Sequence, residues 1–178
     1  MVRNNLTLSA SLVLSCRQRL LELLISTTRV FLKSFHFPDV NVWLAFAVER
    51  HIHHIPAFAW VSSLKIEDRI CVCRFTQISL LRLLTTEAVM REDVMSQKQA
   101  WSVYDRILKD DRFVFIDEPA GVEPRFRTIS QSHRPSAKEW SDSYIAAFAE
   151  AAGMTLVTFD RGLKARVSHA ILLKPQTH

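Results

Sequence analysis

The sequence predicts an α/β protein whose mainly parallel sheet is covered by helices on both faces. Short apolar runs alternate along the chain with longer segments whose apolar residues recur every three or four positions. This alternation is typical of parallel sheets, because each parallel connection needs a crossover helix. The composition agrees with a packed core, since 48% of the 178 residues are hydrophobic and only 3 are Gly. These values argue against disorder and against a sandwich of many tight turns.

The short apolar runs and the helical patterns define the expected elements in order. Strands are expected at residues 34–37, 70–73, 112–116, 155–159 and 170–173. Helices are expected at residues 41–49, 56–64, 76–84, 96–109, 123–130 and 141–152. The last helix has the clearest signals, because Ser141 can cap its start and Gly153 follows its end.

The two ends of the chain are basic, whereas the middle is slightly acidic. The net charge of +5 therefore comes from the ends. It is a weak indication of nucleic-acid binding, because a binding surface needs clustered charge. Residues 1–34 are rich in Leu, Ser, Thr and Arg, and we expect an N-terminal extension that is poorly ordered or a dispensable helix. The domain is expected at residues 35–178.

Export and membrane insertion are not favoured by the sequence. The apolar stretch after Met1 is interrupted by Thr and Ser, and no typical small-residue cleavage site follows it. The longest clean apolar run, residues 42–48, is much shorter than a membrane span. The odd number of cysteines, 3, is typical of reduced thiols. We therefore expect a cytoplasmic protein with no membrane partner.

Three aspartates stand where polar residues can meet at one edge of the sheet. Asp39 follows the first expected strand, Asp160 follows the fourth, and Asp142 lies in the first turn of the last helix. That helix rises roughly 15 Å and the fourth strand runs back roughly 17 Å, so Asp142 and Asp160 return to the same end of the layer. If the first strand lies parallel beside the fourth, Asp39 joins them. Taken singly, each aspartate can also be a cap, a helix-dipole charge or a turn residue.

Three neighbouring carboxylates repel one another, so burying them without a cation is costly. Hard oxygen ligands suit Mg²⁺ or Mn²⁺, which usually keep several waters and bind substrate phosphates. Such an ion can activate water and neutralise the charge that builds up on a phosphodiester. The predicted chemistry is therefore metal-assisted phosphodiester hydrolysis.

Four short motifs carry a family resemblance. They are residues 38–45, residues 73–77 together with 80–85, residues 142–149, and residues 156–161. The first, third and fourth resemble the opening, central-helix and closing motifs of PIN domains, and the second resembles the VapC-type toxins of bacterial toxin–antitoxin pairs. The resemblance covers about residues 35–173. It implies a three-layer fold with a five-stranded sheet, a Mg²⁺-dependent endoribonuclease that cleaves RNA, an antitoxin partner and a possible homodimer.

The resemblance also implies roles for individual residues. Asp39, Asp142 and Asp160 are the expected catalytic residues and metal ligands, with Mg²⁺ as the expected ion and Mn²⁺ as the alternative. Asn41 and Thr158 are expected to orient a ligand or water.

Position 77 departs from the family pattern, which usually has a Glu there. Gln77 can coordinate or hydrogen-bond but brings no charge, so the site is expected to bind metal more weakly or to depend on the three aspartates alone. Arg82 is expected either to contact the RNA backbone or to hold a carboxylate structurally. The alternative to an enzyme is a non-catalytic PIN-like module that binds RNA or protein with a weakened metal site.

A cluster of aromatic residues offers a candidate surface for the antitoxin. An amphipathic segment of the partner is expected to dock in an apolar groove. The candidate lining residues are Trp43, Phe46, Phe58 and Trp60. Packing in the core is the alternative for these side chains, and it is the commoner one.

Overall fold

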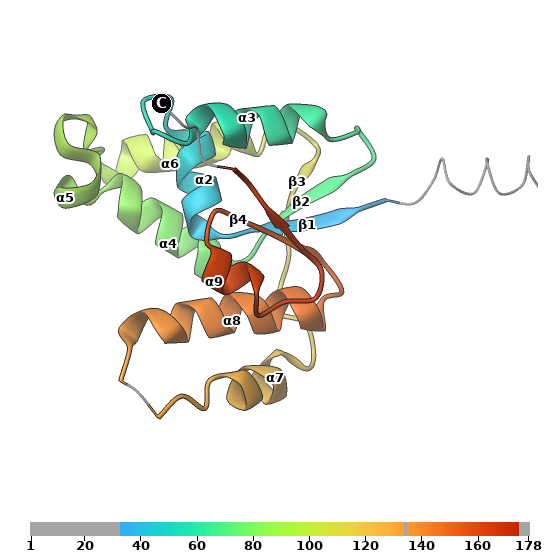
Figure 1. Cartoon of the computed structure of the whole chain (residues 1–178). Coiled ribbons are helices and arrows are strands. Elements are labelled where there is room, and N and C mark those ends of the chain that lie inside the picture. The colour runs from blue at the N-terminus through green and yellow to red at the C-terminus, as the bar shows by residue number, and fades with distance from the viewer. Residues whose placement is uncertain (1–32, 134, 175–178) are drawn as a thin grey trace, which may run out of the picture. The chain divides into compact units, whose positions relative to one another are not determined.

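Parallel strands form the centre of the fold (Figure 1). Within the described residues the sheet has five strands in the order β3-β2-β1-β4-β5, and every neighbouring pair is parallel. The strands are β1 (Phe35–Pro38), β2 (Arg69–Val72), β3 (Phe113–Phe115), β4 (Thr155–Thr158) and β5 (Ala170–Leu172). The predicted five-stranded parallel sheet is confirmed, and each strand lies within a few residues of its expected place.

The structure is a computed structural model that describes residues 33–133 and 135–174. The unit described here begins at Ser34. The expected N-terminal extension, residues 1–34, therefore falls almost entirely outside the described residues. No helix in the described ranges is long and apolar enough to cross a bilayer.

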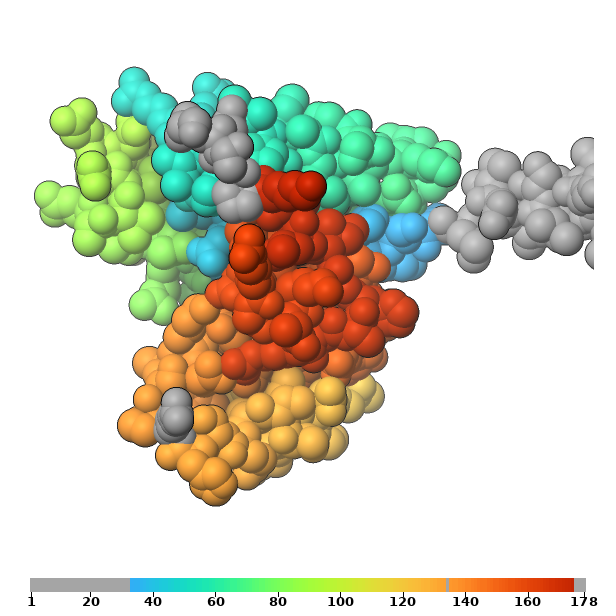
Figure 2. All heavy atoms as spheres, viewed as in Figure 1, coloured from blue at the N-terminus to red at the C-terminus, as the bar shows by residue number. Residues whose placement is uncertain are grey.

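Helices cover both faces of the sheet and give the three layers (Figure 1). One layer contains α2 (Val40–Ala47), α3 (His54–Ser63), α4 (Arg74–Leu84) and α6 (Gln97–Ile107). The other contains α7 (Val122–Ile129), α8 (Ala137–Ala151) and the short α9 (Arg161–Lys164). In Figure 2 the red atoms of the C-terminal segment lie between the teal atoms of α3 and the orange atoms of α8.

An apolar cluster fills the space on each side of the sheet. Successive residues of a strand point to opposite faces, so Leu156 joins the cluster under α8 while Val157 joins the cluster under α2 and α4. Phe37 is fully buried and stacks on Phe148 of α8, with ring centroids 4.7 Å apart. The two layers are thereby fixed against one rigid sheet, and its strand ends are held in place.

The main difference from the predicted elements is the start of α8. The helix begins one turn earlier than expected, because Ser136 Oγ accepts a hydrogen bond from the Glu139 N–H and caps it. Ser141 is therefore not the cap, and Asp142 lies in the second turn rather than the first. The first turn is mostly exposed and has no apolar periodicity, so the sequence pattern becomes visible only further along the helix. The predicted end is confirmed at Gly153, whose φ of +63° suits glycine.

Three short helical pieces were not predicted. They are α5 (Glu87–Met90), the 3₁₀ turn η1 (Arg91–Asp93) and α9. Elements of one turn are too short to show a helical repeat of apolar residues. Between α5 and η1, Arg91 has a φ of +52°, which is unusual for a residue with a side chain.

Candidate active site

A pocket of about 280 Å³ opens at the carboxyl ends of β1 and β4. Asp39 follows β1, Asp160 follows β4, and Asp142 reaches the pocket from α8. β1 and β4 are parallel neighbours with Pro38 beside Val157, which is the arrangement that brings Asp39 to the other two. Asn41 and Arg82 also line the pocket. The structure thus collects five of the seven candidate residues on one surface.

Asp39 is held rigidly at the base of this pocket. Its side chain is 2% exposed, Oδ1 accepts a 2.8 Å hydrogen bond from the Val42 N–H, and Oδ2 accepts one from Thr158 Oγ1. Burial raises the pKa of Asp39 to about 6, although these hydrogen bonds oppose the rise, and the nearby Asp160 adds to it. The carboxylate therefore caps α2 and is also costly to keep charged without a cation.

Thr158 connects the ends of the two central strands. It is fully buried and does not line the pocket. Its hydroxyl donates to Asp39 and accepts a 2.9 Å hydrogen bond from the Asp160 N–H. Thr158 therefore positions Asp39 relative to the turn that carries Asp160. Because it does not line the pocket, it orients a carboxylate and not, as expected, a ligand or water directly.

The two carboxylate oxygens of Asp160 have different partners, backbone N–H groups for one and a lysine for the other. Oδ1 accepts hydrogen bonds from the Gly162 and Leu163 N–H groups, at 2.6 and 3.1 Å, and so caps α9. Oδ2 lies 2.5 Å from Lys138 Nζ, and this ammonium is also 3.3 Å from Asp142 Oδ2. The Lys138 contact is the main cause that lowers the pKa of Asp160, and it raises the pKa of Lys138.

Lys138 is the charged residue of the pocket that the sequence reasoning missed. Its signal was the spacing of four residues to Asp142, which places two side chains on the same face of a helix. That signal became readable only once the helix was known to start at Ser136, because position 138 then lies inside it.

The carboxylates of the pocket suit a hard divalent cation by their chemistry. Within residues 33–133 and 135–174 no three His, Cys, Asp or Glu side chains are arranged to hold a metal ion as they stand. Carboxylate oxygens are nevertheless the preferred ligands of Mg²⁺ and Mn²⁺. The buried Asp39, with its raised pKa, and the ammonium already bound by Asp142 and Asp160 both show that positive charge is favoured here. Asp39, Asp142 and Asp160 are the residues that would hold the ion.

Comparison with known proteins decides the family. The family model described as "PIN domain" matches residues 36–167. Ribonuclease VapC41 of Mycobacterium tuberculosis (strain CDC 1551 / Oshkosh) is 40% identical over 126 residues, which cover 68% of this chain and 86% of that protein. The chain belongs to the PIN-domain family. The resemblance to VapC-type proteins is likewise confirmed.

Solved structures show the same fold at low sequence identity. One is VapBC2 from Rickettsia felis bound to a DNA fragment from its promoter, with a TM-score of 0.57 and 18% identity, covering 78% of this chain and 96% of that one. Another is VapC20 of Mycobacterium tuberculosis, described as a sarcin-ricin loop cleaving toxin, with a TM-score of 0.54 and 15% identity, covering 73% and 93%. The predicted three-layer PIN fold is confirmed by these neighbours.

Gln77 of this PIN domain does not line the carboxylate pocket. α4 presents Phe75, Ser79 and Arg82 to the pocket. Gln77 lies midway between Phe75 and Ser79 in the chain, so the helical period turns it to another side. It is 5% exposed, and its Oε1 accepts a hydrogen bond from Arg74 Nη1. The expectation that Gln77 supports the metal site directly is therefore corrected, since its side chain packs around α4. The other expectation, a site that depends on the three aspartates alone, agrees with the residues that line the pocket.

Arg82 is exposed and unpaired at the edge of the pocket. Among the described residues no carboxylate bonds to its guanidinium, so the structural alternative, in which Arg82 holds a carboxylate, is not what the structure shows. A free guanidinium beside a carboxylate pocket is suited to a phosphate group.

The expected aromatic groove is absent from the described part of the chain. Trp43 and Trp60 are buried, at 2% and 9% exposure, and Phe46 is partly buried against the same core. Only Phe58, at 55%, is exposed among the four. The core alternative therefore holds for Trp43, Trp60 and Phe46, because α2 and α3 turn these side chains toward the sheet.

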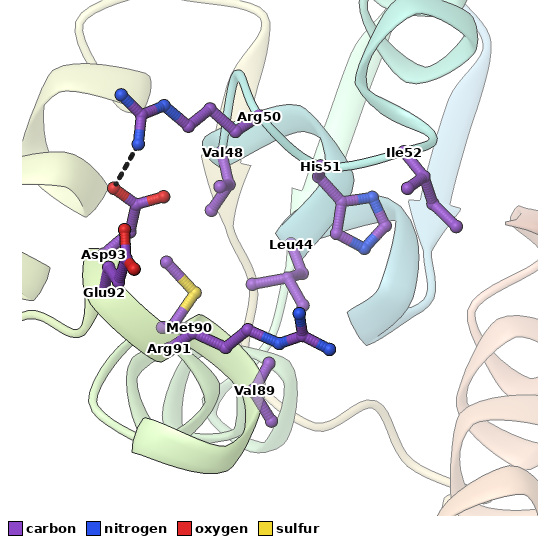
Figure 3. Close-up of a pocket in the computed structure, with 10 residues that line it drawn as sticks. All are labelled: Leu44, Val48, Arg50, His51, Ile52, Val89, Met90, Arg91, Glu92 and Asp93. Carbon is purple, nitrogen blue, oxygen red and sulfur yellow. Dashed lines mark hydrogen bonds and ion pairs between the residues drawn. The ribbon is translucent and has the colours of Figure 1, made fainter.

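A larger pocket of about 590 Å³ lies between the end of α2 and the α5–η1 segment (Figure 3). Its apolar residues include Leu44, Val48 and Met90. Arg50 Nη1 and Asp93 Oδ1 form an ion pair of 3.2 Å at its edge. Figure 3 shows Arg91 extending from the α5–η1 side toward Leu44 and His51. We call this the α2–α5 pocket.

Proposed function

We propose that this protein is a divalent-metal-dependent endoribonuclease, the toxin of a toxin–antitoxin pair, and that it cleaves RNA in the carboxylate pocket. The observation that carries the proposal is the convergence of Asp39, Asp142 and Asp160, from three different elements, beside the exposed Arg82. The names of the VapC relatives, a ribonuclease and an RNA-cleaving toxin, support the same activity.

The residues of the pocket have different roles in the proposed reaction. Asp39, Asp142 and Asp160 hold Mg²⁺, or Mn²⁺ in its place, and Thr158 keeps Asp39 in position. A bound ion of this kind supplies an activated water and neutralises charge on the phosphodiester. Asn41 is exposed in the first turn of α2 and offers an amide to the ligand, and Arg82 binds a phosphate oxygen of the RNA.

The non-catalytic alternative is the second candidate. It depended on Gln77 standing where the family usually has an acid; Gln77 lies outside the pocket, and among the described residues only the three aspartates are acids that line it. The three carboxylates that define the proposed site are all present.

RNA cleavage by the purified full chain tests the proposal. The substrate is a mixture of total tRNA and ribosomal RNA, with Mg²⁺ or with a chelator. We expect cleavage that is lost with the chelator and in Asp142→Asn. The control Asp105→Asn changes an exposed aspartate of α6 outside the pocket and should cleave normally. Cleavage that survives both the chelator and Asp142→Asn would refute the proposal.

The solved neighbours of this chain include VapBC complexes, which supports an antitoxin as partner. We place its docking segment in the α2–α5 pocket, which combines an apolar floor with charged edges. Ile52 and Val89, at 66% and 43% exposure, extend the apolar surface outward. Such a surface suits the apolar face of an amphipathic helix. The free, buried Cys71 and Cys73 suit the reducing cytoplasm in which such a pair would act.

A charge placed in the α2–α5 pocket separates its two candidate occupants, the antitoxin and a second copy of the chain. Val89→Lys should leave RNA cleavage unchanged and weaken inhibition by the antitoxin by roughly tenfold or more, as loss of a central apolar contact does. Val94→Lys, at a similarly exposed site outside this pocket, is the control. If Val89→Lys instead converts a dimer to a monomer in sedimentation, the pocket is the homodimer interface.

A further inference from the structure

Lys138 reaches into the proposed metal site from the first turn of α8. Its Nζ lies 2.5 Å from Asp160 Oδ2 and 3.3 Å from Asp142 Oδ2. The side chain is 64% exposed, so its long stem can swing into solvent without disturbing the core. The carboxylates that it joins are more enclosed, at 14% for Asp142 and 28% for Asp160.

Helix electrostatics do not favour a lysine at this position. The first turn of a helix carries partial positive charge, so a cation there is unfavourable. A lysine that precedes an acidic residue by four positions is also the less favourable order of such a pair. The ion pairs with Asp160 and Asp142 therefore offset the unfavourable interaction of the Lys138 charge with the start of its helix.

Lys138 contacts an oxygen of Asp160 that a metal ion at these carboxylates would need. Asp160 Oδ1 is occupied by the Gly162 and Leu163 N–H groups, which leaves Oδ2 as its outward-facing ligand atom. That atom bonds to Lys138, as does Oδ2 of Asp142. A divalent ion that binds both carboxylates has to take Oδ2 of Asp160, the atom that Lys138 contacts, and its charge would repel the ammonium.

We propose that Lys138 is a built-in competitor of the metal ion, whose ammonium must leave Asp142 and Asp160 before the ion binds both. The inference rests on the proposed function, because it takes these carboxylates as the metal site. Lys138 then sets the metal affinity as a positioning residue that acts through the two aspartates. Arg82 has no such role, since no carboxylate among the described residues bonds to it.

Calorimetric titration of the metal-free full chain with Mn²⁺ tests this directly, without any RNA. We expect Lys138→Gln to bind Mn²⁺ roughly three- to tenfold more tightly than the wild type, the gain from removing one competing ion-pair network. Lys138→Arg keeps the charge and should stay close to the wild type. Lys164→Gln removes the same charge from an exposed position on α9 and should change the affinity by less than about twofold, since exposed charges are screened.

The outcomes separate this inference from the proposed function. Equal or weaker Mn²⁺ binding by Lys138→Gln, with clear binding by the wild type, would refute the competition between Lys138 and the ion but would still support the metal site. A gain of the same size in Lys164→Gln would also overturn it, because general charge would then explain the effect. No saturable binding in any variant would overturn the metal site and the competitor together. The rise in melting temperature on adding Mn²⁺ gives a second readout and should be larger in Lys138→Gln.

Discussion

Buried aspartates stand at both ends of the parallel sheet, Asp39 at the carboxyl ends of the strands and Asp68 at the amino ends. Each accepts two hydrogen bonds: Asp39 from Val42 and Thr158, and Asp68 from the Lys65 and Ser34 N–H groups at 2.9 and 3.2 Å. Their pKa values nevertheless move in opposite directions.

The surroundings explain the difference. Burial is the largest influence on both carboxyls and raises the pKa of Asp39 to about 6, with the like charge of Asp160 adding to the rise. At Asp68 the backbone N–H groups together with His36 outweigh burial and lower the pKa. The comparison teaches that the depth of burial decides the direction of the pKa shift, because hydrogen bonds outweigh desolvation at Asp68 but not at the much more deeply enclosed Asp39. The charged form of Asp68 is stabilised by its neighbours, whereas the charged form of Asp39 is costly unless a cation lies close to it.

The same substitution at the two ends should therefore separate activity from stability. Asp39→Asn keeps a side chain that can cap α2 but removes the charge. We expect it to lower RNA cleavage by about 100-fold or more, as loss of a central electrostatic group does. Its free energy of unfolding without metal should stay within about 1 kcal/mol of the wild type, because a neutral group is cheaper to bury and the Thr158 hydroxyl, unlike a backbone N–H, can accept a hydrogen bond from the new amide. Cleavage assays and thermal unfolding measure the two quantities, and retention of cleavage would remove Asp39 from the site.

Thr158 tests whether the carboxyl end depends on a group that never touches the ligand. Thr158→Val keeps the shape but leaves Asp39 and the Asp160 N–H without their shared partner. We expect about tenfold weaker Mn²⁺ binding, as for other residues that orient a metal ligand, and a loss of about 1–3 kcal/mol of stability. Thr155→Val, at the other end of β4, is the matched control. An unchanged Mn²⁺ affinity in Thr158→Val would show that Asp39 needs no such support.

Much of this arrangement could be predicted from the sequence. Asp39 and Asp160 come after strands, and the lengths of α8 and β4 place Asp142 at the same end of the sheet as Asp160. The local sequence pattern was therefore sufficient to predict that the three carboxylates lie together. Gln77 was misplaced because a motif gives its position in the chain but not the side of the helix that faces the pocket. Lys138 was missed because the exposed first turn of α8 lacks apolar periodicity.

The α2–α5 pocket lay beyond sequence reasoning for a related reason. Its walls come from the loop after α2 and from single-turn elements, including Arg91 with its positive φ. Elements of one turn are too short to show the periodic apolar residues from which a helix is predicted. Conversely, the aromatic residues that were expected to form a groove are apolar enough to be core, and composition alone cannot separate the two.

At the amino end, Asp68→Asn should lower stability and leave RNA cleavage unchanged, which is the opposite of the result expected for Asp39→Asn. The amide has one acceptor oxygen in place of two, so one of the N–H groups of Lys65 and Ser34 loses its partner. We expect a loss of about 1–2 kcal/mol in the free energy of unfolding, the cost of an unsatisfied donor. RNA cleavage by the folded protein should not change. A loss of cleavage at temperatures where Asp68→Asn is fully folded would contradict the division between the two ends.

The smallest effect is expected from the ion pair that precedes β3, also at the amino end. Arg112 Nη2 lies 2.6 Å from Asp110 Oδ2, and Arg112 Nη1 donates to the carbonyls of Val61 and Leu64 at the end of α3. The hydrogen bond from Arg112 lowers the pKa of Asp110. Because Asp110 is 37% exposed, solvent screens the pair and limits its contribution to about 1 kcal/mol or less.

The sign of the pH dependence follows from the lowered pKa of Asp110. The folded protein holds this carboxyl ionised more readily than the unfolded chain, so the stabilisation is present above the unfolded value of about 4 and is lost as pH falls through the folded one. The difference in melting temperature between the wild type and Asp110→Asn should therefore be constant near neutral pH and shrink below about pH 4. Asp111→Asn, at the exposed neighbouring position, should show no such difference. If the gap for Asp110→Asn persists at pH 2, the ion pair is not its source, and the hydrogen bond that the Arg112 N–H donates to Asp110 Oδ1 carries the effect instead.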